Sequence, residues 1–511
     1  MIRPCLFFIV EILAKMGGWL QPELIMGRRI PIWQIILVIA FMIGSLMYTL
    51  VVMKGYMHCA LVAAGAFAAI IAIINGYKWS YLLKGIINNI TSCMQALLIL
   101  FTVGMLIGTW IAGGVIQSMI YYGLMILKPS IFLPAVCLIC AIVSIATGSS
   151  WTTAGTVGLA FIGIGQTLGI PVAMTGGAII SGAYFGDKMS PLSDTTNLAP
   201  AMAGATLFDH IKHMMWTVTP SMIIALILFS FLGMRFKSKS VNLQSIKVLQ
   251  TVLKNNFYIS PLLIIPAVLV IVMVVMKVPA LPGLYGGVWL GAACAIIFQH
   301  DSIGHLVGFE MYEGFVSKTG NDFVDALLTR GGLSSMYYSG ILMICAMVIA
   351  GVLDSSNMMN ILCERVLKRT KGTGSLVATV LVSCIACNIL CADQYVSIVL
   401  PGRMFKEEFE NRHLKPKNLS RCLEDAGTVT SALVPWSTCG AYMSTTLGVA
   451  TTAYAPYAFL NIINPLVSLF YGITGISMER MSDEEYNAIM EKRAKERTSS
   501  AEYRTITEGW R

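Results

Sequence analysis

The feature that most constrains this chain is a succession of apolar runs, each long enough to cross a lipid bilayer, that recur from residue 31 to residue 475. A membrane-spanning helix needs about 20 mainly apolar residues. Runs of this kind lie at 31–53, 55–75, 92–112, 214–234, 257–277, 283–299, 332–352 and 455–475. The sequence therefore predicts an all-α polytopic membrane protein.

The composition argues against other classes of protein. Of the 511 residues, 56% are hydrophobic and 12% are charged, whereas an ordinary soluble domain has about 25% charged residues. A soluble fold could not cover so much apolar surface. The net charge of +9 comes from 35 Lys and Arg residues. Most of them lie in short connections and in the tail, which indicates cytoplasmic membrane loops rather than a face that binds nucleic acid.

The residues that usually carry catalysis are sparse. The six histidines form no His-Glu-x-x-His motif, and the chain has no Gly-rich phosphate loop. We therefore expect neither an enzyme nor a bound cofactor. Many of the thirteen cysteines lie in apolar runs, as small packing residues do. A thiol metal site at Cys384, Cys387 and Cys391 is the less favoured alternative, because no histidine accompanies them.

Two long apolar regions in the first half are interrupted by polar residues. The region 131–170 contains the polar tip Gly148–Thr153, which predicts two short helices that meet in a re-entrant hairpin. The region 172–205 is broken at Gly186–Asn197, where a proline lies among many polar groups, which predicts a discontinuous helix.

The second half repeats this plan at a shift of 244 residues. The shift pairs Cys140 with Cys384, Ser149 with Asp393, Trp151 with Tyr395, Pro191 with Pro435, and Ser193 with Ser437. If each half crosses the membrane about five times, an odd number, the halves have opposite orientations. We therefore predict two inverted repeats, each with a re-entrant hairpin and a discontinuous helix.

These features divide the chain into five parts. We expect an N-terminal extension at 1–30 that forms an interfacial or short membrane helix, a first membrane repeat at 31–235, a connecting loop at 236–256, a second repeat at 257–476 and a polar tail at 477–511. We expect the protein to lie in the cell (inner) membrane. The positive-inside rule places both termini and the basic segments 365–371 and 403–421 on the cytoplasmic side. The basic loop at 235–254 conflicts with this scheme and leaves the orientation of the hairpins open.

The polar tips and breaks at membrane depth are the candidate binding site, because a carboxylate is costly there unless it has a function. Na+ is a hard cation that favours oxygen ligands, and breaks supply free carbonyls together with carboxylates and hydroxyls. We expect Asp194 and Asp393 to contact Na+. The full set of candidates for ion or substrate binding is Gly148, Ser149, Ser150, Thr152, Asp187, Ser193, Asp194, Thr195, Asn197, Asp393, Gln394, Glu424, Asp425, Thr428, Ser437 and Thr438.

Other interpretations apply to some of these residues. Glu424, Thr428 and Ser431 share one face of an α-helix, which could serve as a route for protons or ions. Lys188 beside Asp187 could form only a buried ion pair. Serine and threonine in membrane helices are often packing residues. The charged run 209–213 is expected to be a solvated loop.

Four motifs give the chain a family resemblance: GDKMSPLSDTTNLAP at 186–200, DQY at 393–395, LPGRMF at 400–405 and LEDAGTVT at 423–430. With them the sequence resembles the NhaC-type sodium/proton antiporters of the ion transporter superfamily. The resemblance implies exchange of Na+ for H+ by a homodimer in which a transport domain moves against a scaffold, as in an elevator. The alternative is sodium-coupled exchange or uptake of a small organic anion or amino acid, as in malate/lactate exchange. A channel is a further rival, which saturable counterflow would reject.

Overall fold

The computed structural model describes residues 28–236, 243–276, 278–367 and 370–491. Over these residues the chain is helical, and its β structure is limited to two isolated bridges. The N-terminal extension, apart from its last three residues, lies outside the described part. The prediction of an all-α fold is confirmed.

The first half contains thirteen helical segments of α or π type. They are α2 (Ile32–Met47), η2 (Tyr48–Val52), α3 (His58–Ile74), α4 (Trp79–Ser92), α5 (Met94–Ala112), α6 (Val115–Ile126), α7 (Pro129–Thr147), α8 (Ser150–Thr153), η3 (Ala154–Gly158), α9 (Leu159–Thr167), α10 (Val172–Met189) and α11 (Asp194–Ala203), and the long α12 (Leu207–Met234) closes this half.

The second half follows a similar order. It begins with α13 (Leu243–Asn256), η4 (Pro261–Ile264), α14 (Ile265–Val275), α15 (Ala280–Phe298), α16 (Ile303–His305), η5 (Leu306–Glu310), α17 (Asp322–Leu328), η6 (Leu333–Met336), α18 (Tyr337–Ser355) and α19 (Met358–Leu367). It ends with α20 (Thr373–Leu390), α21 (Gln394–Asn411), α22 (Pro416–Leu423), η7 (Glu424–Thr428), α23 (Val429–Ser431), α24 (Thr438–Leu447), α25 (Thr451–Tyr454), η8 (Ala455–Tyr457) and α26 (Phe459–Thr474).

The two interrupted regions break where the sequence indicated. Helix α7 ends because Gly148 adopts a left-handed φ of 66°, and the Ser149 side chain then accepts a hydrogen bond from Thr152 N to start α8. In the second half, Ala392 has a φ of 55° and Asp393 caps α21. Both breaks therefore place one left-handed residue after the first helix and start the next helix with a side-chain cap.

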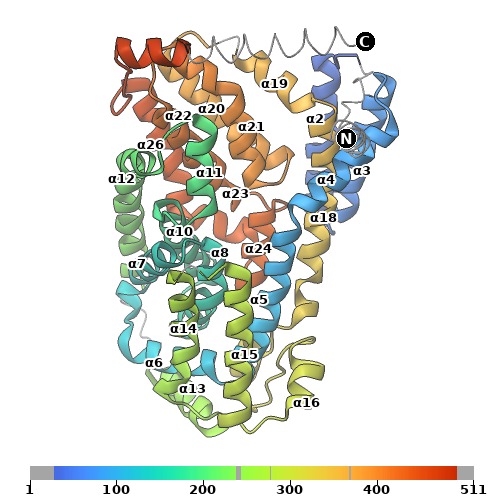
Figure 1. Ribbon diagram of the computed structural model, residues 1–511. Coiled ribbons are helices and arrows are strands. Elements are labelled where there is room, and N and C mark those ends of the chain that lie inside the picture. Colours follow the sequence, from blue (N-terminus) through green and yellow to red (C-terminus); the bar gives the residue numbers. More distant parts are fainter. Residues whose placement is uncertain (1–27, 237–242, 277, 368–369, 492–511) are drawn as a thin grey trace, which may run out of the picture.

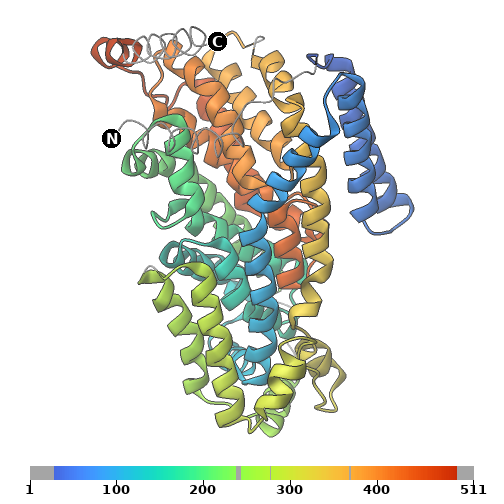
Figure 2. The same ribbon diagram turned by 45° about the vertical axis from the view of Figure 1, so that its right-hand side comes forward.

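The helices run mainly along the length of the molecule, with α19, α20 and α22 at one end and α6, α13 and α16 at the other (Figure 1). Helix α10 packs closely on α7, and a Cβ added at Gly182 would lie 2.1 Å from Cys137 O, so glycine is required there. Helix α5 packs on α15, whereas α2 and α3 form a pair at the side of the molecule (Figure 2).

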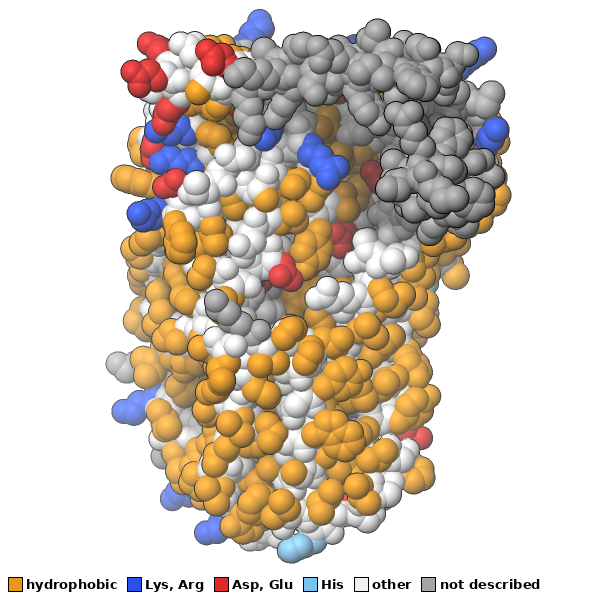
Figure 3. Space-filling model, in the orientation of Figure 1, with side chains coloured by type: hydrophobic (Ala, Val, Ile, Leu, Met, Phe, Trp, Pro, Cys, Tyr) orange, Lys and Arg blue, Asp and Glu red, His pale blue; other side chains and the backbone are white. Residues whose placement is uncertain are grey.

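Seven helices of the described residues are long and apolar enough to span a membrane, and two bent pairs would raise the number to nine. Apolar side chains cover most of the lower two thirds of the face in Figure 3, and many charged side chains lie towards its upper end. This distribution fits a chain surrounded by lipid over most of its length.

One prediction about a charged segment is wrong. The run 209–213 is not a solvated loop but the first turns of α12, and His210 and His213 are buried. Their rings contact the Ser420 hydroxyl at 2.8 Å and the Ser477 carbonyl at 2.7 Å. Within the basic segment 403–421, Arg421 is fully buried in α22.

Candidate functional site

The interrupted helices meet at one cavity of about 780 Å³. Its walls come from the start of α8, the connection between α10 and α11, and the starts of α21 and α24. The opposite wall comes from the end of α4, the start of α5 and residues 278–280. The cavity therefore lies where two groups of helices face each other.

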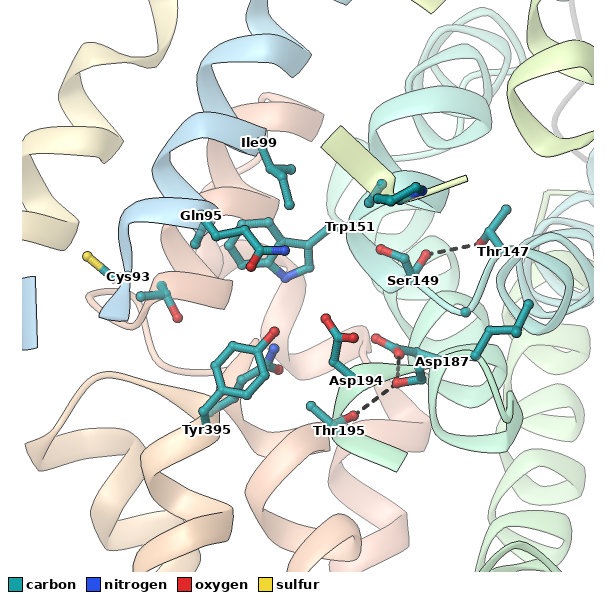
Figure 4. Close-up of a pocket in the computed structure, with 18 of the residues that line it drawn as sticks. Cys93, Gln95, Ile99, Thr147, Ser149, Trp151, Asp187, Asp194, Thr195 and Tyr395 are labelled. Carbon is teal, nitrogen blue, oxygen red and sulfur yellow. Dashed lines mark hydrogen bonds between the residues drawn. The ribbon is translucent and has the colours of Figure 1, made fainter. Parts of the chain in front are cut away.

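The structure brings many of the candidate residues to this cavity. Those that line it are Gly148, Ser149, Asp187, Ser193, Asp194, Thr195, Asp393, Gln394 and Thr438. Asp194 and Asp393, the expected Na+ ligands, are both among them. Figure 4 shows the Asp187 and Asp194 carboxyl groups near each other, with the Tyr395 and Trp151 rings also in the cavity.

Asp187 is held by donors from two breaks. Its Oδ2 atom accepts hydrogen bonds from Ser150 N at 3.1 Å and Ser150 Oγ at 2.6 Å. Its Oδ1 atom accepts one from Ser193 Oγ at 2.5 Å, and Ser193 Oγ also contacts Thr195 Oγ1 at 3.2 Å. This carboxylate ties the start of α8 to the connection between α10 and α11.

The other two carboxylates have different environments. Asp393 Oδ1 accepts hydrogen bonds from Tyr395 N at 2.8 Å and Val396 N at 3.1 Å, so one of its oxygens caps α21. Asp194, the first residue of α11, is exposed to the cavity. Its oxygens are the more accessible to a cation.

The remaining candidates of this group shape the breaks rather than line the cavity. Thr152 and Ser437 are buried, and Ser437 Oγ bonds to the Ser431 and Val434 carbonyls. Asn197 is exposed, and its Nδ2 atom donates to Pro191 O at 2.9 Å and Ser193 O at 2.7 Å. These bonds fix the connection between α10 and α11.

Lys188 does not pair with Asp187. Its ammonium group contacts Asp425 Oδ1 instead, and both side chains are fully buried. Asp425 Oδ1 also accepts hydrogen bonds from Thr217 at 2.9 Å and Asn464 at 2.8 Å. Arg421 Nε lies 3.7 Å from Asp425 Oδ2. The possible Lys188–Asp187 ion pair is thus wrong, and Asp425 is the centre of a charged cluster that joins the two halves of the chain.

Glu424 lies beside this cluster. Its side chain is fully buried, and neither of its carboxylate oxygens has a hydrogen-bond partner among the described residues. Lys188, Thr195 and Thr428 face it. Residues 424–428 form the π-helical turn η7, so the assumption of an uninterrupted α-helix from Glu424 to Ser431 is wrong, although Thr428 still lies next to Glu424.

Comparison with known proteins identifies the family. Residues 182–476 match the Na+/H+ antiporter family. The chain is 38% identical to the malate-2H+/Na+-lactate antiporter of Bacillus subtilis over 88% of this chain and 96% of that protein. It is 36% identical to the Na+/H+ antiporter NhaC of Alkalihalophilus pseudofirmus over 89% of this chain and 98% of that protein. It is also 35% identical to the arginine/ornithine antiporter of Halobacterium salinarum over 90% and 95% of the two chains.

The chain belongs to the Na+/H+ antiporter family. It is therefore a multi-pass membrane antiporter, and the resemblance found in the sequence is confirmed.

Some residues of the antiporter's cavity were not predicted. Tyr395 and Trp151 line it, and the shift of 244 residues that pairs them was the available signal. Trp151 stacks on Tyr442 with ring centroids 4.0 Å apart, and the Tyr442 hydroxyl donates to Trp151 O at 2.8 Å. Gln95 lies on the opposite wall, and nothing in its sequence context distinguishes it.

The charge of the cavity is negative. Three carboxylates line it, and none of the described lining residues is Lys, Arg or His. The cations of this region, Lys188 and Arg421, are already paired with Asp425. The antiporter's cavity is thus suited to a cation, with oxygen ligands from carboxylates and hydroxyls.

Proposed function

We propose that this protein is a secondary active transporter that exchanges Na+ for H+ across the cell membrane. The observation that carries the proposal is the cavity lined by Asp187, Asp194 and Asp393 without a basic side chain among its described lining residues. A dehydrated Na+ ion needs several oxygen ligands, and these carboxylates and their neighbouring hydroxyls supply them. Na+ is the transported ion, and we expect no other bound cofactor.

In the proposed mechanism, Na+ and H+ compete for the cavity carboxylates. Asp194 is the principal ligand because it is the most accessible of the three, and Asp393 adds its remaining oxygen. Protonation neutralises these groups and releases Na+, since a neutral carboxylic acid is a much weaker cation ligand. The site then crosses the membrane in one direction with Na+ bound and in the other with H+ bound.

Glu424 provides the route by which protons leave the cavity. Thr195 lines the cavity and also faces Glu424, which in turn lies beside Thr428. Because it is fully buried beside these two hydroxyls, Glu424 is placed to accept a proton from the cavity and to release it. Asp425 is not a transport ligand in this proposal, because Lys188 and Arg421 already neutralise it.

An alternative function is exchange of a small organic solute, such as a carboxylate or an amino acid, coupled to Na+. The volume of about 780 Å³ favours this alternative, because it lies in the range of small-molecule sites, about 300–1,000 Å³. The negative charge of the cavity argues against a carboxylate, which an arginine would normally bind, and is compatible with a cationic amino acid.

The decisive experiment uses proteoliposomes loaded with a pH-sensitive dye and challenged with Na+, Li+, K+, malate, lactate, arginine or ornithine. Na+-driven proton movement without any organic solute supports the main proposal. Proton or Na+ movement that requires an organic solute supports the alternative. Asp194→Asn should abolish the signal, whereas Asp322→Asn, which neutralises an exposed carboxylate of α17, should not change it.

We also propose that residues 31–235 and 257–476 are inverted repeats with α7–α9 and α20–α21 as re-entrant hairpins. Equivalent boundaries support this: α7 and α20 start at 129 and 373, α8 and α21 at 150 and 394, and α11 and α24 at 194 and 438, each 244 residues apart. Single cysteines at Lys128 and Gly372, the caps of α7 and α20, should react with an impermeant maleimide from opposite sides of the membrane. Labelling from the same side contradicts the inversion.

Finally, we propose that the protein is a homodimer that works as an elevator, with both termini in the cytoplasm. The cavity lies between the interrupted helices and a wall formed by α4, α5 and residues 278–280, so movement of one group past the other would change its access. Native mass spectrometry and chemical cross-linking in liposomes test the dimer, and cross-linking between the two walls should stop exchange.

A further inference from the structure

Away from the cavity, three side chains of metal-binding type meet in the connection that follows α15. Asp301 comes just after α15, His305 is the last residue of α16, and Glu310 is the last residue of η5. This connection lies at the end of the molecule opposite α22 (Figure 1). The cluster is therefore separate from the residues proposed above for transport.

The distances between the ligand atoms are close to those of a shared metal ion. His305 Nδ1 lies 3.5 Å from Asp301 Oδ1 and 3.7 Å from Glu310 Oε1, and the three ligand atoms lie within 4.8 Å of one another. Zn2+ binds nitrogen and oxygen at about 2.0–2.2 Å, which separates two ligands of a tetrahedral site by about 3.3–3.6 Å. The two distances from His305 Nδ1, 3.5 and 3.7 Å, lie within or just above this range, and the distance between the two carboxylate ligand atoms is no more than 4.8 Å.

Glu310 supplies an independent indication of a missing positive charge. The residue is only 5% exposed, and no hydrogen-bond partner of its Oε2 atom exists among the described residues. Burial of an unsatisfied carboxylate oxygen is costly. In the described part of the chain, His305 is the one ion-pair partner of Asp301 and Glu310. Two neighbouring carboxylates with one shared imidazole favour an added cation.

We propose that Asp301, His305 and Glu310 bind a first-row divalent transition-metal ion such as Zn2+. One imidazole and two carboxylates suit such an ion better than Na+ or Ca2+, which prefer oxygen ligands alone. Three protein ligands leave the remaining coordination positions to water.

The ion would fasten this connection to the helices next to it. The Glu310 backbone rests on α5, where a Cβ at Gly108 would lie 2.5 Å from Glu310 O. The next residue, Met311, accepts a hydrogen bond at its carbonyl from Leu333 N at 3.0 Å, at the start of η6. A bound ion thus links the end of α15 to the segment that packs on α5 and leads into α18. It stabilises the folded protein because it binds only the folded arrangement.

The test is a titration of the full-length protein with Co2+, after removal of any polyhistidine tag. We expect one equivalent to bind with d–d absorption typical of nitrogen and oxygen ligands, Zn2+ to displace it, and the melting temperature to rise. His305→Ala and Glu310→Gln should each weaken binding more than tenfold. His300→Ala removes an exposed imidazole five residues earlier and should leave binding unchanged.

Three results would overturn the proposal: no stoichiometric binding by the unaltered protein, a thiolate-to-cobalt charge-transfer band that places the ion on cysteine, or undiminished binding by His305→Ala. The side chain of His305 is 56% exposed, so its replacement should not prevent folding. The melting temperature of each variant in the presence of a chelator checks this point, and Glu310→Gln keeps the size of the buried side chain.

Discussion

Replacement of Asp425 by asparagine tests the buried charged cluster most directly. The change keeps the size of the side chain and one acceptor oxygen, so the bonds from Thr217 and Asn464 can persist. It removes the charge that neutralises Lys188 and Arg421. All three side chains are fully buried, and water can therefore not replace the lost interaction.

The cost follows from the geometry. Two unit charges 3.7 Å apart, the distance between Arg421 Nε and Asp425 Oδ2, attract each other by about 4.5 kcal/mol at an effective dielectric constant of about 20. Removal of one partner from a buried ion pair costs about 3–5 kcal/mol. Because two cations lose their partner here, we expect Asp425→Asn to lower the free energy of unfolding by about 5 kcal/mol, at the upper end of that range.

Variants of Lys188, alone and combined with Asp425→Asn, should show an order of stabilities that a general loss of packing would not produce. Lys188→Met leaves Asp425 paired with Arg421, so it should cost less than Asp425→Asn. The double variant removes one of the two stranded cations and should be more stable than Asp425→Asn alone, with a coupling energy of about 1–3 kcal/mol.

Unfolding in detergent micelles, followed by intrinsic fluorescence and by denaturant titration, measures these differences, with Asp322→Asn as a surface control. If the free energy of unfolding of Asp425→Asn lies within about 1 kcal/mol of that of the unaltered protein, the loss is smaller than the cost of a typical broken buried ion pair. The cluster would then not stabilise the fold. The reasoning also fails if the double variant is no more stable than Asp425→Asn.

Three further predictions concern other parts of the chain. Glu424→Gln should abolish Na+-dependent proton movement in dye-loaded proteoliposomes with little change in melting temperature, because neither oxygen of Glu424 has a hydrogen-bond partner among the described residues; retained exchange would exclude the proton route. Gly182→Ala should destabilise the protein by about 1–3 kcal/mol, because its Cβ would lie 2.1 Å from Cys137 O, whereas Gly44→Ala, which meets nothing within 4 Å, should be neutral or stabilising in thermal unfolding. Hydrogen bonds from Thr319 and Ser317 hold the pKa of Asp325 below its usual value of 3.8. The stability that these bonds provide is therefore present above pH 3.8 and is lost as the pH falls through the lower pKa of the folded state. The stabilities of the unaltered protein and of Asp325→Asn, measured by acid titration, should converge below pH 3.8, and a difference that persists at lower pH would contradict this.

The sequence predicted those features of the fold that are encoded locally. The lengths of the apolar runs determine where helices can span, and glycine with neighbouring polar residues determines where they stop, as at Gly148 and Ser149. The shift of 244 residues placed Asp393 at the start of α21 in the same role that Ser149 has at the start of α8. The cavity lining followed from these breaks because side chains at broken helices must face one another or water.

The partners of the buried charges could not be predicted in this way. Lys188 follows Asp187 directly, yet it pairs with Asp425, which is 237 residues away. The turn geometry of α10 sends the two side chains in different directions, and only the packing of α10 against η7 and α26 decides what each one meets. His210 and His213 were misjudged for the same reason, because a charged run resembles a solvated loop until its tertiary neighbours are known.

The π-helical turn at 424–428 makes the placement of Glu424 and Asp425 depend on the exact number of residues in that turn. Each residue of an α-helix turns the chain by about 100°. Deletion of a single residue here would let the helix continue as an ordinary α-helix, in which Glu424 and Asp425 could not both keep their present directions. Arg421 and the two carboxylates could then no longer face their partners together. The wide turn thus sets the directions of two neighbouring buried carboxylates, and an unbroken α-helix would set them differently.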